Sequence, residues 1–575
     1  MFRRILVNPC SWIIAGAVAV RLVVVLWSGY AAEDAFITFR FARQLAAGNG
    51  FVYNPPEHIY GTTTPLQTIL LAGWLLIPGQ DVLAAARFFS FIAMVATYCL
   101  VSQILKQLGY SRVQRLFVLG LLGLSSRFWF YDTSAMETPL VIFFLAASWY
   151  AFTTNRFCLC GLLAGLLLWT RIDTFLWPLL LILAELRAGF KNSLRIFLAT
   201  GISYLPWVCF AWFYFSSPIP FTINAKWVAY GQFDTNPLVN HLITSLKSLS
   251  AIEVPVEMSS IVLILSLTTL GFAAWQIIKS PKNRTHLVLP VFVFLEITRL
   301  VVTRATFFSR YYAPALWVLI ILAGLGLGCY WERIRTPTHY ERPVLALIMA
   351  SGVTVVLSIP LSFLIRSLEF SNDWSWVVLL IWIFILFDFL VIVIFWRRIQ
   401  NSTGFYQWSF RLFLGTFIIL GLTNGVLVTD QARQTQLYRH EMALKAMGQW
   451  LNQNTPVGAT VQLEPLGYSG YYADRVMLDE VGLVTPRVVE LKREGILDSV
   501  QYIPILKPDY VVVHCDDALR WKSQTRADPA GFANQYGLTV RFNPLQFNAS
   551  APLDRSFETV LARSSCYEIW ESLAL

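Results

Sequence analysis

Long apolar stretches recur along this chain from Cys10 to Val428, many of them near 20 residues in length. A helix of about that length can cross the hydrocarbon core of a bilayer, which is about 30 Å thick. Only 14% of the 575 residues are charged, whereas soluble globular domains average about 25%. The chain is therefore predicted to be a polytopic α-helical membrane protein.

The hydropathy pattern predicts about thirteen transmembrane helices. The segment 65–77 is apolar but short for a span, so it is predicted to be an interfacial helix. With that choice every strongly basic loop falls on one side, which the positive-inside rule makes cytoplasmic. The N-terminus is then cytoplasmic and the C-terminal residues lie outside an inner (plasma) membrane. The predicted spans lie near residues 10–30, 82–104, 115–128, 138–154, 157–171, 174–187, 196–215, 258–279, 286–302, 311–332, 343–366, 375–396 and 409–429.

The net charge of +10 has the same explanation. Lys and Arg residues sit in short loops between apolar stretches, which is the topology signal of an inner-membrane protein. The sequence has no basic face with interleaved aromatic residues of the kind that binds nucleic acid. The lipid bilayer is the expected partner, and a nucleic acid is not. The eight cysteines form no CxxC motif or His/Cys cluster, so the sequence gives no indication of a zinc site.

The composition changes after residue 429, where charged residues, Asn, Gln and Pro become frequent. We therefore expect two domains, a transmembrane module (1–429) and a small extracytoplasmic α/β domain (430–575). Residues 441–451 fit an amphipathic helix, and the segments ATVQLEP, DYVVVH and CYEIWES fit short strands. Cys515 follows one strand and Cys566 precedes another. Outside the cytoplasm they could form a disulfide; two separate buried thiols are the alternative.

The first outer loop, residues 31–64, is the segment most typical of a reaction site. It leaves the first span directly into the paired acids Glu33 and Asp34. An amphipathic helix follows, which Gly48-Asn49-Gly50 ends. Transfer of a sugar to a hydroxyl needs a general base, and a carboxylate at the membrane surface can serve. Acids at the end of a span are also common solvated caps, and that alternative applies to a bare acid pair.

A lipid-borne sugar donor would bring its phosphate to the depth of this acid pair. Cations are the groups that hold a phosphate and stabilise the charge that develops on it. The candidates at the same outer level are Arg40, Arg171, Lys226, Arg304 and Arg310.

The loop resembles the first outer loop of the GT-C superfamily of glycosyltransferases. It is most similar to the branch that contains the mycobacterial terminal arabinofuranosyltransferases. In the loop, the matching residues are Glu33-Asp34, Phe39-Arg40-Phe41-Ala42-Arg43, Gly48-Asn49-Gly50, Tyr53-Asn54-Pro55 and Gly61-Thr62-Thr63. Elsewhere they are Ser134-Ala135-Met136-Glu137-Thr138-Pro139, Thr170-Arg171-Ile172-Asp173, Pro218-Ile219-Pro220, Asn224-Ala225-Lys226, Arg310-Tyr311-Tyr312-Ala313-Pro314, Gly467-Tyr468-Ser469-Gly470-Tyr471-Tyr472 and Leu478-Asp479-Glu480-Val481-Gly482-Leu483.

The resemblance implies a GT-C-like fold and assigns roles to these residues. Asp34 would be the catalytic base with Glu33 beside it, and Tyr311 would join the cations at the donor phosphate. Asn54 and His58 would contact the acceptor, although His58 also fits a plain surface position. The chain departs from the pattern where Pro56 replaces a glycine and where His58-Ile59-Tyr60 replaces Arg-Val-Glu. These changes leave the sugar and the acceptor open.

We therefore expect an inverting glycosyltransferase on the extracytoplasmic face. Its donor would be a polyprenyl-phosphate-linked monosaccharide, with arabinofuranose as one candidate sugar. Its acceptor would be a cell-envelope glycan, a glycolipid or a protein. The alternatives are a transporter or lipid-glycan flippase, whose ionisable residues would line a path through several spans, and an oligosaccharide ligase that uses a diphosphate donor.

A divalent cation is a further expectation that the resemblance leaves open, because some GT-C enzymes use one. Asp132, Glu137 and Asp173 are outer acids that could bind it together with Asp34. The spacing of these acids does not dictate a metal site, so no metal ligand is assigned.

Two charged positions inside predicted spans need partners of their own. Arg21 lies within the first span, where a charge is costly. It is expected either to have a buried partner or to extend its guanidinium to the outer surface. Glu296 and Arg299 are three residues apart on a predicted helix, so they are expected to pair with each other.

Overall fold

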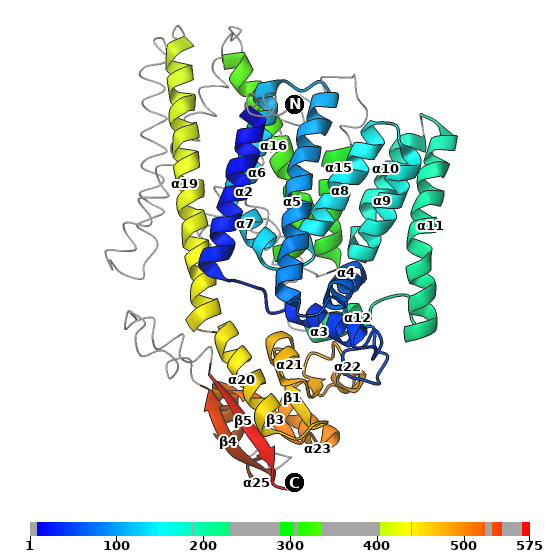
Figure 1. Ribbon diagram of the computed structural model, residues 1–575, viewed down its shortest axis with the longest axis vertical. Coiled ribbons are helices and arrows are strands. Elements are labelled where there is room, and N and C mark those ends of the chain that lie inside the picture. Colours follow the sequence, from blue (N-terminus) through cyan, green and yellow to red (C-terminus); the bar gives the residue numbers. More distant parts are fainter. Residues whose placement is uncertain are drawn as a thin grey trace.

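The computed structural model describes residues 9–186, 188–230, 288–303, 309–334, 403–438, 440–523, 532–542 and 566–574. The predicted spans at 258–279, 343–366 and 375–396 lie outside the described residues. The described part has a bundle of helices and, at one end of it, a small domain that contains a sheet (Figure 1). Both parts of the predicted fold class are therefore present: a mostly helical module and a small C-terminal α/β domain.

The helical module uses both long and short helices. Three short helices, α3, α4 and α12, lie at the end of the bundle that faces the small domain (Figure 1). The elements of the module are α2 (Pro9–Ser28), α3 (Ala35–Ala46), α4 (Pro65–Leu75), α5 (Val82–Gln107), α6 (Arg112–Leu124), α7 (Ser126–Thr133), α8 (Thr138–Thr153), α9 (Phe157–Thr170), η1 (Ile172–Thr174), α10 (Leu176–Leu186), α11 (Phe190–Phe215), α12 (Phe221–Tyr230), α15 (Val288–Val302), η4 (Ser309–Tyr312), α16 (Ala313–Ile334) and α19 (Thr403–Tyr438).

Every predicted span within the described residues overlaps a helix, but the helices differ in length. Within the part of the chain that the structure describes, four stretches are long and apolar enough to cross a membrane: Pro9–Ser28, Val82–Gln107, Phe190–Phe215 and Ser309–Glu332. A fifth candidate is the pair α7 and α8, which bend by 108° at a short break. Helices such as α9, with 14 residues, rise only about 1.5 Å per residue and are short for a full crossing. The chain has the composition and helices of a multi-pass membrane protein, and the count of about thirteen spans is not confirmed.

Arg21 is buried inside the bundle and has partners. Its Nε lies 3.2 Å from Asp132 Oδ2, and its other nitrogens donate to the carbonyl oxygens of Gly123 (2.6 Å) and Leu122 (3.1 Å) and to the hydroxyl of Tyr98 (3.3 Å). A charge in this apolar environment would be costly without such partners. Of the two expectations for Arg21, the buried partner is the one found.

The small domain begins where α19 ends. Helix α19 continues past residue 429, the predicted domain boundary, and ends at Tyr438. The domain has one five-stranded sheet of order β2-β1-β3-β5-β4. Strand β1 pairs in parallel with β2 and β3, whereas β5 pairs antiparallel with β3 and β4. Its elements are α20 (His440–Asn454), β1 (Thr460–Leu463), α21 (Gly467–Ala473), β2 (Val476–Asp479), α22 (Pro486–Arg493), η5 (Ser499–Tyr502), α23 (Ile503–Leu506), β3 (Tyr510–His514), α24 (Cys515–Ser523), α25 (Phe532–Gln535), β4 (Tyr536–Phe542) and β5 (Tyr567–Ser572).

Cys515 and Cys566 form a disulfide, with their Cα atoms 5.4 Å apart. The sequence left their pairing open, and the bonded alternative is the one found. The bond joins the start of α24 to the residue before β5, so it closes a loop over a sequence separation of 51. Cys515 N–H also donates to the carbonyl oxygen of Cys566 at 3.0 Å.

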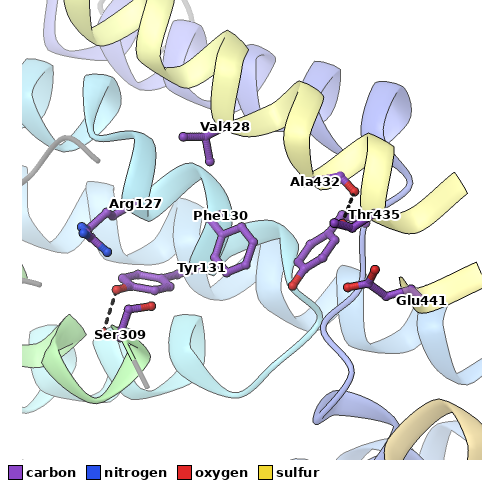
Figure 2. A pocket seen from close by; sticks show the side chains of 9 residues that line it. Arg127, Phe130, Tyr131, Ser309, Val428, Ala432, Thr435 and Glu441 are labelled. Atoms are coloured by element: carbon purple, nitrogen blue, oxygen red, sulfur yellow. Dashed lines mark hydrogen bonds between the residues drawn. The ribbon is translucent and has the colours of Figure 1, made fainter. Parts of the chain in front are cut away.

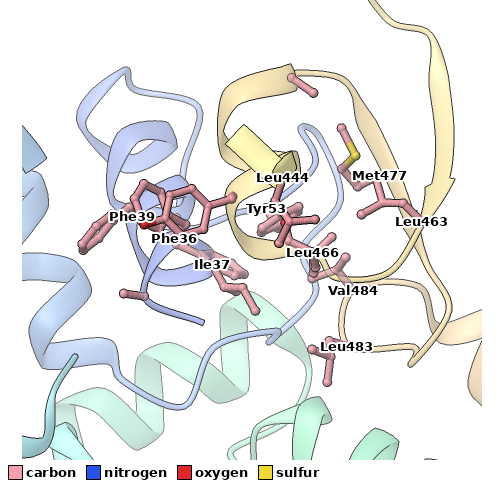
Figure 3. Packing of buried hydrophobic residues seen from close by; sticks show 14 of the residues in the cluster. Phe36, Ile37, Phe39, Tyr53, Leu444, Leu463, Leu466, Met477, Leu483 and Val484 are labelled. Carbon is pink, nitrogen blue, oxygen red and sulfur yellow. The ribbon is translucent and has the colours of Figure 1, made fainter. Parts of the chain in front are cut away.

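The first outer loop and the small domain share one hydrophobic core. Helix α3 buries nine of its twelve residues, and Phe36 stacks on Tyr468 with ring centroids 3.8 Å apart. Behind α3, the hydroxyl of Tyr53 donates to the carbonyl oxygen of Leu466 at 2.8 Å. Figure 3 shows Phe36, Tyr53 and Leu466 among the buried side chains that pack between α3 and the small domain. The amphipathic helix predicted after Asp34 is therefore present, and the small domain covers its apolar side.

Candidate active site

The acid pair stands where α2 passes into α3, held from two sides. Ala32 N–H donates to the carbonyl oxygen of Ser134 at 2.9 Å, which ties the pair to the turn between α7 and α8. On the other side, Gly467 N–H, the first residue of α21, donates to Oε1 of Glu33. A Cβ at Gly467 would lie only 2.1 Å from the carbonyl oxygen of Glu33. Only glycine lets the small domain come this close to the acid pair.

Asp34 forms an ion pair with Arg310, whose guanidinium reaches it from η4. The side chain of Asp34 keeps 25% of its surface exposed and that of Arg310 keeps 15%. The carboxylate is thus held in place by a cation and still open to a reactant. This ion pair brings together two residues that the sequence assigned to the same site.

The two acids have opposite protonation tendencies. Burial raises the pKa of Glu33 well above its ordinary value, and the nearby charge of Asp34 raises it further. Burial also raises the pKa of Asp34, but the positive charges of Arg310 and Lys226 outweigh it, so the pKa is lowered overall. A hydrogen bond joins the two carboxyl groups. These opposite shifts favour a protonated Glu33 beside an ionised Asp34.

Three cations surround the ring of Tyr311, next to Arg310 in the chain. The guanidinium of Arg171 lies 4.7 Å from the ring centroid, that of Arg310 lies 5.4 Å away, and Nζ of Lys226 lies 5.9 Å away. Lys226 Nζ also donates to the Tyr311 hydroxyl at 3.3 Å. Such contacts with an aromatic face stabilise a cation. The side chains of Arg171, Lys226 and Arg310 thus concentrate positive charge around Tyr311, beside the carboxyl group of Asp34.

The positive charge of Arg171 is balanced by two nearby acids, Asp173 and Glu137. Arg171 Nε donates to Asp173 at 2.9 Å, and its Nη1 lies 3.9 Å from Oε1 of Glu137. The predicted pair of Glu296 and Arg299 is confirmed, with Nε to Oε2 at 3.0 Å, and Arg299 also reaches Asp173 at 3.5 Å. Glu137 is buried, and its Oε2 has no hydrogen-bond partner in the described structure. A substrate hydroxyl group could satisfy it.

Arg40 lies away from this cluster, although the sequence placed it at the donor phosphate. Its guanidinium donates to the carbonyl oxygens of Tyr53 (2.9 Å), Gly470 (2.6 Å) and Arg475 (2.6 Å) and to Oδ1 of Asn54 (3.3 Å). It is 2% exposed and stacks on the Tyr53 ring. In this geometry Arg40 joins the first outer loop to the small domain.

The predicted acceptor residues are also separated. Asn54 donates to the carbonyl oxygen of Met477 (2.9 Å) and accepts from its N–H (3.1 Å), so its amide completes the edge of β2. His58 is exposed and stacks on Tyr214 of α11, with ring centroids 4.1 Å apart. Arg304 lies outside the described residues.

Two contributions to the site could not be read from residue types alone. Gly467 contributes a backbone N–H, and the chain pattern gives no sign that a residue of the tail meets Glu33. Glu137 was considered only as a ligand for a cation; here it lies beside Arg171. Among the residues that the structure describes, no group of three His, Cys, Asp or Glu side chains is placed to hold a metal ion.

Comparisons with known proteins give a family for the tail and a fold for the whole chain. Residues 430–570 match a protein-family model described as "Domain of unknown function (DUF8728)". No curated protein matches the sequence. Among solved structures, ArnT from Cupriavidus metallidurans bound to undecaprenyl phosphate is similar, with a TM-score of 0.52 and 13% identity over 89% of this chain and 94% of ArnT.

Two further structures are similar to the chain. ArnT of the same organism in the apo state has a TM-score of 0.50 and 12% identity, over 90% of this chain and 94% of ArnT. The Archaeoglobus fulgidus oligosaccharyltransferase, tethered with an acceptor peptide, has a TM-score of 0.49 and 12% identity, over 88% of this chain and 69% of that one. The likeness to ArnT extends over nearly the whole chain and shows that the two proteins share a fold. The arabinofuranosyltransferase branch is not confirmed.

Proposed function

We propose that this chain is an inverting glycosyltransferase that takes a monosaccharide from a polyprenyl-phosphate donor on the extracytoplasmic side. One observation carries the proposal: the carboxyl group of Asp34 is partly exposed and paired with Arg310 at the edge of a cation cluster, whose charge lowers its pKa. A base beside a phosphate-sized cluster of cations is what glycosyl transfer from a lipid phosphate requires. The fold shared with ArnT, of which one structure holds undecaprenyl phosphate, supports the same donor class.

In the proposed reaction, Asp34 accepts the proton from the acceptor hydroxyl. The hydroxyl oxygen forms a bond to the anomeric carbon, and the bond from that carbon to the phosphate oxygen breaks. The phosphate oxygen leaves with the bonding electron pair, and Arg171, Lys226 and Arg310 stabilise its charge. Tyr311 orients these cations through its ring and its hydroxyl. A single displacement of this kind inverts the anomeric configuration.

Arg310 would link donor binding to the basicity of Asp34. In the structure its positive charge, second only to burial among the influences on Asp34, lowers the carboxyl pKa. A donor phosphate that attracts the guanidinium of Arg310 would weaken this influence. The pKa of Asp34 would then rise towards that of a better base, at the moment when the donor is in place.

Glu33 has a supporting role in the proposal. As the protonated member of the pair, it donates a hydrogen bond to Asp34 and keeps the proton off the catalytic carboxylate. No step of the proposed reaction uses a metal ion. The identity of the sugar is a separate proposal: the motif resemblance suggests arabinofuranose. The proposed acceptor is a glycan, a glycolipid or a protein.

The orientation of the chain is likewise part of the proposal. The basic loops favour a cytoplasmic N-terminus and an extracytoplasmic small domain, which places the acid pair at the outer surface of the bilayer. Labelling of introduced cysteines from each side of the membrane tests this placement. A finding that residues of the small domain are labelled only from the cytoplasm would contradict it.

The central test uses Asp34→Asn, which keeps the shape of the side chain and removes its basicity. We expect transfer of a labelled sugar from a polyprenyl-phosphate donor to fall by about 100-fold or more, with normal membrane insertion and retained binding of polyprenyl phosphate. Glu490→Gln is the matched control, because Glu490 is an exposed acid on α22 that pairs with Arg487. Near-normal transfer by Asp34→Asn would overturn the mechanism.

A further inference from the structure

A cavity of about 290 Å³ lies beside the acid pair, where the helical module meets the small domain. Its wall comes from the connection after α2, from α7, from η4, from the end of α19 and from the start of α20, as Figure 2 shows. None of the described residues that line it belongs to the cation cluster around Tyr311. The described lining residues are Tyr30, Arg127, Phe130, Tyr131, Ser309, Val428, Ala432, Thr435 and Glu441.

Glu441 gives this cavity a buried polar group without a complete set of partners. Its residue is only 7% exposed, and its Oε2 has no hydrogen-bond partner in the described structure. Burial raises the pKa of Glu441 to about 6, and a hydrogen bond with Thr435 acts in the opposite direction. A buried carboxyl oxygen without a partner is costly. A ligand group that donates a hydrogen bond inside the cavity would remove that cost.

Two of the lining residues, Ser309 and Tyr30, connect the cavity to the reaction centre. Ser309, which accepts a hydrogen bond from Tyr131 at 2.8 Å, directly precedes the Arg310 that pairs with Asp34. Tyr30 lines the cavity, and the charges of Glu441, Arg310 and Asp34 all act on its hydroxyl. The cavity therefore lies close enough to the ion pair of Asp34 and Arg310 for their charges to act on one of its lining residues.

We propose that this cavity binds a sugar residue of the acceptor, so that the acceptor is a glycan or a glycolipid. Sugars present apolar faces that stack on aromatic rings and hydroxyl groups that pair with carboxyl and hydroxyl groups. The cavity supplies both kinds of partner: the packed rings of Tyr30 and Phe130, 4.8 Å between centroids, and the polar groups of Thr435 and Glu441. Ligand pockets span roughly 300–1,000 Å³. This cavity, at about 290 Å³, lies at the lower limit of that range, so its size suits a small ligand such as a single sugar residue.

This inference rests on the proposed function and names the acceptor class for the same site. It divides the site into two halves. The donor phosphate lies at the cations around Tyr311, the acceptor sugar lies in the cavity, and Asp34 lies between them. The acceptor hydroxyl would therefore approach Asp34 from the Tyr30 side.

The test measures access to the cavity directly, in the full-length protein in lipid nanodiscs. Ala432 faces the cavity from α19 and is 9% exposed, so the thiol in Ala432→Cys would react with a small methanethiosulfonate reagent through the cavity. Mass spectrometry of that peptide gives the rate. We expect octyl glucoside or octyl arabinofuranoside, below micelle-forming concentrations, to slow the reaction at least threefold. Octanol and polyprenyl phosphate should change the rate by less than 1.5-fold.

Three further variants sharpen this test. Val457→Cys, at a residue 92% exposed in the small domain, is the control, and glycosides should leave its labelling rate unchanged. Glu441→Gln added to Ala432→Cys should raise the glycoside concentration needed for half-maximal protection at least fivefold. Glu490→Gln added to Ala432→Cys should leave that concentration unchanged. Equal protection by octanol, protection by polyprenyl phosphate alone, or no protection by either glycoside would overturn the proposal.

Failure of this inference can be told apart from failure of the proposed function. If labelling is insensitive to glycosides while Asp34→Asn still abolishes transfer from the donor, only the acceptor assignment is wrong. If Asp34→Asn transfers sugar normally, the mechanism is wrong, whatever the labelling experiment shows.

Discussion

The guanidinium of Arg310 pairs with the carboxylate of Asp34 although 276 positions separate the two residues in the sequence. The pair joins the first outer loop to η4, at the start of the long apolar helix α16. It also places Arg310 between two partners, because its guanidinium lies 5.4 Å from the centroid of Tyr311. A single cation thus contacts both the base and the cluster assigned to the donor phosphate.

Replacing Arg310 with Gln should move the acid limb of the pH–activity profile to higher pH. In the native protein, burial raises the pKa of Asp34, and the charges of Arg310 and Lys226 together with hydrogen bonds overcome it, so the net shift is downward. Without the cation, the effect of burial prevails and the pKa of Asp34 rises. Asp34 is then protonated at a higher pH, and activity is lost earlier as the pH falls. The profile of kcat/KM against pH measures this.

Arg310→Lys is the control for that experiment, because it keeps the positive charge. Its acid limb should stay close to that of the native protein, even if its rate is lower. An Arg310→Gln profile with an unmoved acid limb would show that Arg310 does not set the ionisation of Asp34.

Glu33→Gln should make the protein less sensitive to rising pH. The folded-state pKa of Glu33 is raised by burial and by the charge of Asp34, whereas the unfolded chain has the ordinary Glu value of about 4.3. A group with a raised folded pKa contributes stability that is full below the unfolded pKa and is lost as the pH rises through the folded one. Gln does not titrate, so the variant should gain stability relative to the native protein between about pH 5 and pH 8.

Thermal unfolding of the purified protein at the two pH values measures the effect. Activity should fall by less than about 10-fold, because the Gln amide can still donate a hydrogen bond to Asp34. A stability difference that shrinks as the pH rises would mean that Glu33, not Asp34, is the ionised member of the pair.

The sequence predicted the acid pair and much of its surroundings because those features are local. An apolar span ending in Glu33-Asp34, an amphipathic helix and a glycine stop can be read directly, and α3 is found at Ala35–Ala46. Strand patterns such as that of β3 at Tyr510–His514 were also readable. Shared depth in the membrane was enough to group Arg171, Lys226 and Arg310, which do lie together around Tyr311.

A common depth in the membrane does not determine the direction in which a side chain points, and Arg40 is an example. It lies on the first outer loop with the acid pair, so it was assigned to the phosphate. Its partners are carbonyl oxygens, among them those of Gly470 and Arg475, more than 400 positions away. Backbone acceptors leave no mark on residue type. The short helices α6 and α9 were similarly hard to judge, since apolar residues recur alike in spanning and non-spanning helices.

Arg40→Met should therefore cost stability rather than donor affinity. The substitution keeps much of the apolar volume but leaves the carbonyl oxygens of Tyr53, Gly470 and Arg475 without their donor. A buried acceptor that loses its hydrogen-bond donor costs about 1–3 kcal/mol. We expect a clearly lower unfolding temperature, with unchanged affinity for polyprenyl phosphate in the fraction that remains folded. Weakened binding at unchanged stability would instead return Arg40 to the donor site.

Gly467→Ala should reduce transfer by separating the small domain from the acid pair. A Cβ at this position would lie 2.1 Å from the carbonyl oxygen of Glu33 and 2.4 Å from its Oε1, distances at which the backbone must move. The N–H that donates to Glu33 would move with it, and displacing a group in a catalytic constellation by about 1 Å can cost about 100-fold in rate. Gly201→Ala on α11 is the matched control, because its Cβ would meet no atom within 4 Å. Transfer by Gly467→Ala equal to that of Gly201→Ala, in proteins of equal stability, would show that contact with the small domain does not position the catalytic pair.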